Sequence, residues 1–484
     1  MSVGRTTARA AIWAFLATAG SKAVTLVGLA LLARLLAPNE FGLLAFAMAY
    51  ITYAEAIGDL GTGVALVYWP DRRDDAAQVT FIVNAAAGVA WCLITLAIAP
   101  FVADFFNAEH GTPIVQVLAF SFIIKFLGNT HDALLQKDLR FRARLMPDLA
   151  LAGVKAVVSL GFAWYGYGAW SLVYGHLAGM AARTVLVWVA VPWRPTLRLP
   201  LDLFRPMLSY GRGIIIINVL TAIAHHADIA IVGRYLGTRD LGLYQIATKI
   251  PETTVIMLLW VVGRVLFPAF TKLQAEGVSL RTPYLTSSKY VTELTMPTAI
   301  GTCVLAQPMI VTFFGPVWHP AAPILGALAI YAAMRCVSTS AGDVLKAMNR
   351  APLLAHLSWV RTGCAVPLMI WGAQYSAFWL AVALATVTGV SGIVMLVLAA
   401  RVVDVRLRDL AAAFIPGTVA SGVMAAACLG WLRWTAHAPA PVQLAGGVII
   451  GAIVYAVVLV LIDRDLISTV RRHLGGRREA VGPA

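Results

Sequence analysis

Long apolar stretches follow one another along almost the whole chain, and short polar connections separate them. A membrane-spanning helix needs about 20 predominantly apolar residues. The longest connections, 193–205 and 271–282, leave no room for an independently folded domain. The pattern therefore predicts an all-α polytopic membrane protein. It predicts fourteen spans, at about 11–33, 41–67, 78–103, 114–135, 146–167, 169–192, 207–233, 241–268, 286–313, 321–347, 353–373, 377–400, 410–434 and 442–462.

Basic residues are distributed unequally between alternate connections. One set of connections carries 23 Lys and Arg residues, whereas the other set carries only 4. Basic connections stay on the cytoplasmic side of a membrane, so both termini are expected in the cytoplasm. One missed helix would destroy this alternation, which supports the span count.

Composition agrees with the apolar pattern. The chain is 60% hydrophobic and only 12% charged, whereas soluble domains carry about 25% charged residues. The formal net charge of +14 resembles that of a nucleic-acid-binding protein. Most of the basic residues, however, lie in the predicted cytoplasmic connections, where they set topology and contact anionic lipids. We therefore expect membrane lipids, and no nucleic acid, as partners.

A sequence repeat relates the two halves of the chain. Residues 33–47 read ARLLAPNEFGLLAFA, and residues 233–247 read GRYLGTRDLGLYQIA. An offset of 200 residues covers six predicted spans, and an even number keeps both copies in the same orientation. The repeat predicts two parallel six-helix lobes and two extra C-terminal helices. The expected divisions are an N-lobe (1–200, spans 1–6), a C-lobe (201–405, spans 7–12), two additional helices (406–465) and a basic cytoplasmic tail (466–484).

Ten Lys and Arg residues lie inside the predicted spans and outnumber the eight interior acids. Each cation near the bilayer centre costs about 2.5–3.5 kcal/mol, so most should face water or partners. Many lie on narrow polar stripes at helical spacing, which indicates a central cationic cavity. Such a cavity favours a phosphate- or pyrophosphate-bearing substrate. The expected substrate-binding cations are Lys22, Lys125, Lys155, Arg183, Arg212, Lys249, Lys289, Arg335 and Arg361.

The same stripes carry acidic and amide side chains. Na⁺ or H⁺ are the coupling ions that such acids could bind, although a lone acidic pair is a weak signal. A structural alternative stays open, because Lys289–Glu293 and Lys249–Glu252 have the spacing of internal ion pairs. We find no catalytic constellation, metal spacing or cofactor motif. The polar or coupling candidates are Glu55, Asp59, Asn218, Asp228, Glu252 and Glu293.

Several segments resemble the Wzx-type flippases of polysaccharide biosynthesis, within the multidrug/oligosaccharidyl-lipid/polysaccharide (MOP) superfamily. They are ARLLAPNEFGLLAFA (33–47), IGDLGTGVAL (57–66), LLQKDLRFRARL (134–145), ADIAIVGRYLGTRDLGLYQIATKIP (227–251), LFPAFTKLQ (266–274) and VLKAMNRAPLL (344–354). The resemblance covers roughly residues 10–420.

The resemblance implies fourteen helices in two lobes around a V-shaped cavity, in a bacterial inner membrane. It implies translocation of undecaprenyl-pyrophosphate-linked oligosaccharide from the cytoplasmic to the periplasmic leaflet. A polysaccharide polymerase and export machinery are the implied partners. The family has no strict catalytic motif, so no residue is assigned by resemblance.

Two other functions compete with this one. A drug or cation antiporter of the same superfamily would be expected to have an acidic cavity, whereas this one is predicted to be basic. A membrane-embedded polysaccharide polymerase or lipid-linked glycosyltransferase would be expected to need a sizeable extramembrane region, and the short connections provide none. We therefore expect a transporter and not an enzyme.

Overall fold

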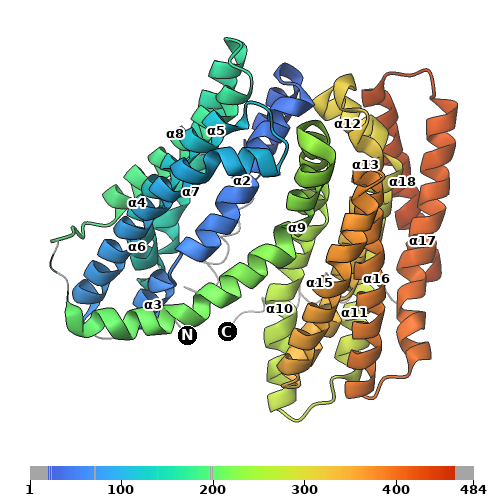
Figure 1. Ribbon diagram of the computed structural model, residues 1–484. Helices are drawn as coiled ribbons and strands as arrows, with labels where there is room; N and C mark the ends of the chain where they lie inside the picture. Colours follow the sequence, from blue (N-terminus) through green and yellow to red (C-terminus); the bar gives the residue numbers. More distant parts are fainter. Residues whose placement is uncertain are drawn as a thin grey trace, which may run out of the picture. The chain divides into compact units, whose positions relative to one another are not determined.

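The computed structural model describes residues 20, 22, 24–69, 72–138, 140–196, 198 and 200–463, and it is all-helical over these residues (Figure 1). By internal contacts the chain divides into two compact units, Met1–Gln245 (unit 1) and Ile246–Ala484 (unit 2). The predicted tail 466–484 and residues 11–19, 21 and 23 of the first predicted span lie outside the described residues.

Unit 1 is a bundle of apolar helices. A short helix, Val24–Leu35, precedes the others. In Figure 1, α4, α6, α7 and α8 lie together, and α7 packs along α8. The helices are α2 (Pro38–Gly58), α3 (Thr62–Tyr68), α4 (Arg73–Phe105), α5 (Gly111–Leu118), α6 (Phe120–Lys137), α7 (Phe141–Trp164), α8 (Ala169–Ala190) and the first part of α9 (Leu201–Thr254).

The α7–α8 contact is close because α8 presents glycines to α7. A Cβ atom at Gly175 would overlap the side chain of Ser159, and one at Gly179 would lie 2.9 Å from the Cβ of Lys155. Small residues let membrane helices approach closely and pack by dispersion forces. Lys155 therefore lies on a tightly packed helix pair.

Glycines also mark two helix breaks. The predicted span 41–67 is divided into α2 and α3, and Gly61 stands at the break with φ 68°. A Cβ there would lie 2.8 Å from the backbone of Gly211 in α9. Within α9, Gly237 has φ 80° and ψ −177°, which separates two helical parts inside the repeated segment 233–247. Only glycine adopts such conformations without steric cost.

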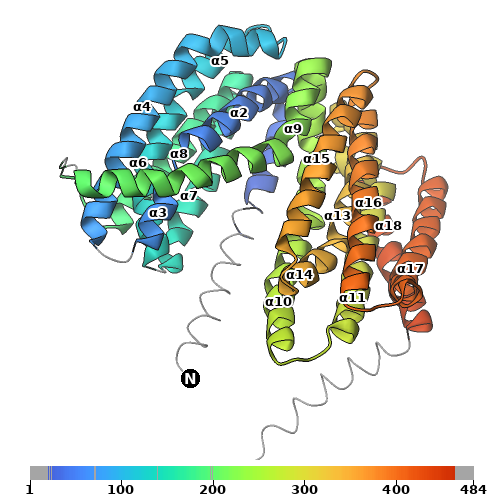
Figure 2. The ribbon, with the colours of Figure 1, turned by 60° about the horizontal axis from the view of Figure 1, so that its bottom comes forward.

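Unit 2 contains the remaining helices, and Figure 2 shows them from a second direction. α11 packs on α17, α17 packs on α18, and α13 and α15 both pack on α16. α11 and α12 meet at Leu305 with a bend of 72°. The helices are α10 (Ile256–Ala275), α11 (Arg281–Val304), α12 (Ala306–Phe314), α13 (Ala321–Val337), α14 (Thr339–Ala347), α15 (Ala351–Ala373), α16 (Ala377–Val402), α17 (Leu407–Trp434) and α18 (Ala440–Ile462).

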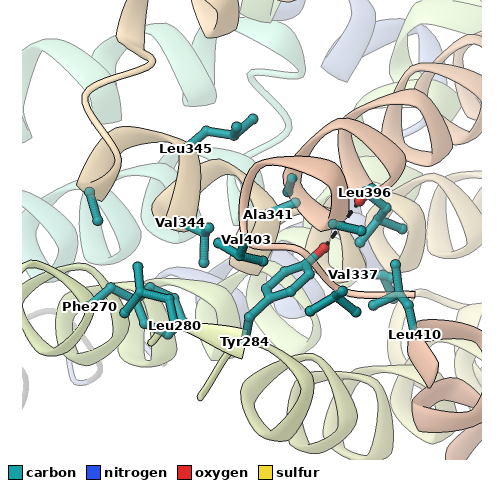
Figure 3. Close-up of a cluster of buried hydrophobic side chains, with 14 residues drawn as sticks. Phe270, Leu280, Tyr284, Val337, Ala341, Val344, Leu345, Leu396, Val403 and Leu410 are labelled. Carbon is teal, nitrogen blue, oxygen red and sulfur yellow. Dashed lines mark hydrogen bonds between the residues drawn. The ribbon is translucent and has the colours of Figure 1, made fainter. Parts of the chain in front are cut away.

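A buried apolar cluster fixes one end of unit 2 (Figure 3). Tyr284 of α11 is fully buried there, and its hydroxyl donates a hydrogen bond of 3.3 Å to the carbonyl oxygen of Leu396. Phe270, Val344 and Val403 bring α10, α14 and the end of α16 into the same cluster. Full burial of such a side chain stabilises the fold by about 1.5–3 kcal/mol. The cluster therefore holds the first turns of α11 in place, close to Lys289 and Glu293.

Within the described residues, eleven helices are long and apolar enough to cross a membrane, or twelve if the bent pair α11–α12 is one span. The chain is therefore a multi-pass membrane protein, as predicted. The count of fourteen spans and the two lobes of six helices stay predictions. The boundary between the two compact units follows Gln245, whereas the repeat predicts a boundary between the lobes after residue 200. The difference arises because the first part of α9 packs on the other helices of unit 1. Gly211 of α9 lies directly against the backbone carbonyl of Leu60.

Candidate functional site

Lys125 and Glu55 form an ion pair inside unit 1. The Nζ of Lys125 on α6 lies 2.7 Å from Oε2 of Glu55 on α2, and the two side chains are 35% and 19% exposed. A predicted substrate cation thus contacts a predicted coupling acid. The local positive charge of Lys125 is compensated within the protein itself.

Arg183 occupies the centre of a second charged group. Its Nη2 lies 3.0 Å from Oδ1 of Asp132, and its Nε lies 3.1 Å from Oδ1 of Asp148. Arg144 approaches the same acids, with its Nη2 2.9 Å from Oδ2 of Asp132. Two guanidinium groups and two carboxylates together carry no net charge. The sequence predicted Arg183 as an interior cation but placed Arg144 in a connection.

Two predicted cations come together near His176 of α8. Both Lys125 and Lys155 lie within electrostatic range of this imidazole. Lys125 comes from α6 and Lys155 from α7, so three helices contribute to one group. The central cationic cavity that the polar stripes indicated stays a prediction.

The polar candidates of unit 1 make backbone and hydroxyl contacts. Asp228 of α9 accepts hydrogen bonds of 2.7 Å from the Tyr244 hydroxyl and 2.9 Å from the backbone N–H of Ile229. Asp59 accepts one of 3.2 Å from the N–H of Gly61, which stabilises the break between α2 and α3. Asn218 is partly exposed, and Arg212 is exposed with no ion pair to a described residue.

Lys22 stands at the edge of what the structure describes. Its side chain is partly exposed, and its sequence neighbours 1–19, 21 and 23 lie outside the described residues. Its role in substrate binding stays a prediction.

Lys249 and Glu252 form the local ion pair that the helical spacing allowed. The Nζ of Lys249 lies 3.0 Å from Oε2 of Glu252, and the side chains are 40% and 50% exposed. Exposed pairs of this kind contribute little to stability, about 0.2–1 kcal/mol. Both groups therefore remain accessible to a charged ligand.

Lys289 has a different partner from the one that its spacing suggested. Its Nζ lies 2.6 Å from Oδ2 of Asp463, at the end of α18, and no ion pair to Glu293 within 4.0 Å is formed by these described residues. Glu293 lies one helical turn from Lys289 and is only 7% exposed. A contact between distant helices has displaced the local pair, because Asp463 is buried against the same face of α11.

Arg335 and Arg361 are two cations of unit 2 that lie within electrostatic range of each other. Nη1 of Arg335 on α13 donates a hydrogen bond of 3.2 Å to the hydroxyl of Tyr331. Arg361 on α15 lies within electrostatic range of both Tyr331 and Arg335. Neither guanidinium group forms an ion pair with an acid among the described residues of unit 2. Two positive charges within electrostatic range of each other, and without an ion-paired acid in the described part of unit 2, favour the approach of an anion.

Solved structures of membrane transporters share the fold of this chain. The chain superposes on the lipid II flippase MurJ with a TM-score of 0.77 and 16% identity, covering 94% of this chain and 100% of that one. It also matches a multidrug resistance MATE family transporter of the MOP superfamily, with a TM-score of 0.62 and 14% identity, covering 81% and 94% of the two chains. The fold is therefore that of the MurJ- and MATE-type membrane transporters.

Residues 31–323 match the family described as polysaccharide biosynthesis protein, and the chain belongs to this family. The succinoglycan biosynthesis transport protein ExoT of Rhizobium meliloti (strain 1021) is 24% identical over 99% of this chain and 98% of its own length. The lipopolysaccharide biosynthesis protein WzxC of Escherichia coli (strain K12) is 24% identical over 77% and 76%. The teichuronic acid biosynthesis protein TuaB of Bacillus subtilis (strain 168) is 25% identical over 70% and 71%. The predicted resemblance to polysaccharide flippases is confirmed.

Proposed function

We propose that the protein is a flippase for lipid-linked oligosaccharides. It moves undecaprenyl-pyrophosphate-linked precursors of a polysaccharide from the cytoplasmic to the periplasmic leaflet by alternating access. The observation that carries this proposal is the similarity to a succinoglycan transport protein over 99% of the chain. The MurJ-like fold supports it, because that neighbour is named as a lipid II flippase.

In the proposed architecture, fourteen helices form two parallel six-helix lobes and two additional helices. The protein resides in a bacterial inner membrane with both termini in the cytoplasm. A polysaccharide polymerase and export machinery take over the translocated precursor. The asymmetry of Lys and Arg between alternate connections supports this orientation.

Arg335 and Arg361 are the best candidates for contacting the pyrophosphate. Unlike Lys125, Arg183 and Lys289, neither has an acidic partner among the described residues. Guanidinium groups bind phosphate oxygens through a planar fork of N–H donors. The paired cations, by contrast, have structural partners that a substrate would have to displace.

Transport by the purified, reconstituted protein tests the proposal. Proteoliposomes containing the full chain should move a fluorescent undecaprenyl-pyrophosphate oligosaccharide to the inner leaflet faster than protein-free vesicles, as reported by a membrane-impermeant quencher. Equal rates with and without the protein would refute a flippase.

A drug or cation antiporter is the second candidate, because a MATE transporter shares the fold. The ion pairs of unit 1 leave no excess of acids in the described group around Lys125 and Arg183. Efflux of a cationic dye driven by a proton or sodium gradient, without movement of lipid-linked oligosaccharide, would favour this alternative. A polymerase or glycosyltransferase is not proposed, since relatives are named as transport and biosynthesis proteins and the fold is that of transporters.

A further inference from the structure

Two neighbouring cavities of unit 2 form one apolar groove along α16. The first has a volume of about 430 Å³ and lies between α11, α13 and α16. The second has a volume of about 350 Å³ and is bounded by the same helices and by α17. Met334 and Gly389 line both cavities, so the two adjoin. Apart from the hydroxyl groups of Thr386 and Thr418 the lining is apolar, which suits a hydrocarbon chain.

The groove has a buried floor and an exposed rim. Val337, Leu396 and Leu410 form the floor and belong to the apolar cluster of Figure 3. At the rim, Ile393 and Leu407 are 61% and 49% exposed. Large apolar side chains that are exposed on membrane helices favour contact with hydrocarbon over contact with water. A lipid chain can therefore enter the groove from its rim.

Helix packing fixes the walls of the groove. α17 packs on α11, where a Cβ atom at Gly417 would lie 3.1 Å from the Cα of Glu293. On α18, the hydroxyl of Tyr455 donates a hydrogen bond to the backbone carbonyl oxygen of Glu293. Met296 of α11 and Thr418 of α17, close to these contacts in sequence, line the second cavity. The helices on either side of this cavity are thus held together, and the groove is a preformed feature of the bundle.

Arginines continue the lining faces at one end of the groove. On α16, Arg401 lies one helical turn after Val397, and on α17, Arg406 lies one turn before Leu410. Arg408 follows in the first turn of α17. All three arginines are exposed and form no ion pair with an acid among the described residues of unit 2. The apolar groove therefore ends at a group of accessible positive charges.

Nearby acids do not cancel this charge. Asp404 and Asp409 are the acids between the end of α16 and the first turn of α17. Asp409 is already paired with Arg281 of α11, at 3.0 Å. Asp404 alone faces an excess of basic residues, so this end of the groove attracts an anion.

The length of α16 places these arginines at the level of lipid headgroups. The helix has 26 residues and is therefore about 39 Å long. The hydrocarbon core of a bilayer is only about 30 Å thick. Arg401, in the last turn, thus reaches the headgroup layer. A lipid phosphate there can accept hydrogen bonds from guanidinium groups while its acyl chain runs back along the groove.

We propose that the groove along α16 binds one anionic phospholipid. One acyl chain lies against Gly389 and Ile393, and the phosphate contacts Arg401 and Arg406, with Arg408 adding to the positive charge. The lipid is a bound partner of the protein and not its cargo.

The lipid site is separate from the cations proposed to contact the pyrophosphate. Neither Arg335 nor Arg361 lines either cavity. The lipid site also does not depend on the proposed flippase function, because its test measures binding alone. A failed transport assay and a failed lipid-binding assay therefore refute different statements.

Native mass spectrometry of the purified full-length protein tests the headgroup contact. Delipidated protein in a non-ionic detergent is titrated with palmitoyl-oleoyl phosphatidylglycerol or palmitoyl-oleoyl phosphatidylcholine. It should bind one phosphatidylglycerol in preference to phosphatidylcholine, by roughly five-fold for each arginine that contacts the phosphate. Arg401→Gln and Arg406→Gln should each reduce this preference by that factor. Arg433→Gln is the matched control, because it removes an exposed arginine from the last turn of α17. Equal affinity for the two lipids, or arginine variants that behave like the control, overturns the site.

Filling the groove tests the acyl-chain contact. A Cβ atom at Gly389 would lie 3.6 Å from Cγ of Met334, so the longer side chain of Gly389→Leu would project into the groove and should weaken binding of both lipids. Gly363→Leu is the control, because Gly363 of α15 is exposed and a Cβ there has no neighbour within 4 Å. Equal binding by these two variants overturns the groove as the chain site. The arginine variants change exposed side chains only, so the test does not depend on the folding of Gly389→Leu.

Competition identifies the occupant. Excess inorganic phosphate should leave phosphatidylglycerol bound, because it lacks a chain for the groove. An equal concentration of undecaprenyl phosphate should also leave it bound. Displacement by inorganic phosphate would reduce the site to a phosphate contact, and displacement by undecaprenyl phosphate would assign the groove to an isoprenoid lipid. Either result overturns the phospholipid site.

Discussion

Gly42 and Gly242, which occupy equivalent positions of the repeat, each lie against the backbone carbonyl four residues before the other. A Cβ atom at Gly42 would overlap the carbonyl oxygen of Thr238, and one at Gly242 would overlap that of Pro38. The Thr238 hydroxyl also donates a hydrogen bond to the side-chain oxygen of Asn39. Within unit 1, each copy of the repeat therefore contacts the equivalent position of the other copy. Such a reciprocal contact is expected of two segments related by a two-fold axis.

Replacement of either glycine by alanine should destabilise the protein. Each substitution places a methyl group on a backbone carbonyl, and overpacking of this kind costs about 1–3 kcal/mol. Thermal unfolding of the purified protein should show a lower Tm for Gly42→Ala and Gly242→Ala. Gly213→Ala is the control, because a Cβ there has no neighbour within 4 Å. Equal Tm values for the control and the two variants would contradict the reciprocal contact.

The ion pair between Lys125 and Glu55 should appear as energetic coupling. Groups in direct contact show interaction energies of about 0.5–3 kcal/mol in double-mutant cycles. We expect Lys125→Ala and Glu55→Ala each to lower stability, and the double variant to lose less than the sum. The measurement is the unfolding midpoint of all four proteins. Additive losses would show that the contact contributes nothing.

Loss of the Arg183 side chain should lower the stability of the protein, because Asp132 and Asp148 would then have Arg144 as their remaining cationic partner. Removal of one partner of a buried pair costs about 3–5 kcal/mol, and the 22% exposure of the Arg183 side chain favours the lower end. Arg183→Ala should therefore reduce the yield of folded protein and its Tm. Arg183→Lys should recover part of the loss, since it restores the charge but not the two-sided contact. A stable Arg183→Ala variant would contradict the bridging role.

Removal of the Tyr244 hydroxyl should weaken the contact to Asp228. A hydrogen bond to a charged group contributes about 1.5–3 kcal/mol. We expect Tyr244→Phe to lower the Tm measurably. Tyr235→Phe removes a hydroxyl from a residue that is 52% exposed and should leave the Tm unchanged. Indistinguishable Tm values for the two variants would exclude a stabilising role for the buried hydroxyl.

Arg335 and Arg361 should affect transport more than stability. Loss of a charge-assisted contact of about 1.5–3 kcal/mol corresponds to roughly a 10- to 100-fold lower flipping rate. Arg335→Ala and Arg361→Ala should show this loss in proteoliposomes, with lysine variants in between. Arg433→Ala removes an exposed charge near the end of α17 and should keep the wild-type rate. Wild-type rates for both alanine variants would remove these residues from the substrate site.

The all-helical, multi-pass membrane fold could be predicted from the sequence because it follows from the length of apolar stretches along the chain. Contacts between distant helices could not. The spacing of Lys289 and Glu293 suggested a local pair, but burial of Asp463 at the end of α18 gave Lys289 another partner. Arg144 belonged to a basic connection by position, yet it reaches Asp132. Sequence periodicity identifies the face of a helix but not the helix that faces it.

One of the two breaks within spans could not be predicted. Gly61 lies inside the predicted span 41–67, and its close contact with Gly211 accompanies the break between α2 and α3. The bend of 72° between α11 and α12 is different, because Pro308 lies in the first turn of α12 and cannot donate the N–H that would continue α11. The position of a proline is visible in the sequence, whereas a contact between distant helices is not.

The cover that α17 and α18 provide over Glu293 has a consequence for shortened forms of the chain. A protein that ended near residue 405 would retain both repeated segments but would lose Gly417, Tyr455 and Asp463. Glu293 would then face lipid or water, and Lys289 would lose its partner. The last two helices are therefore not an appendage that can be trimmed to obtain a minimal transporter, and engineered chimaeras of this family should exchange them together with α11.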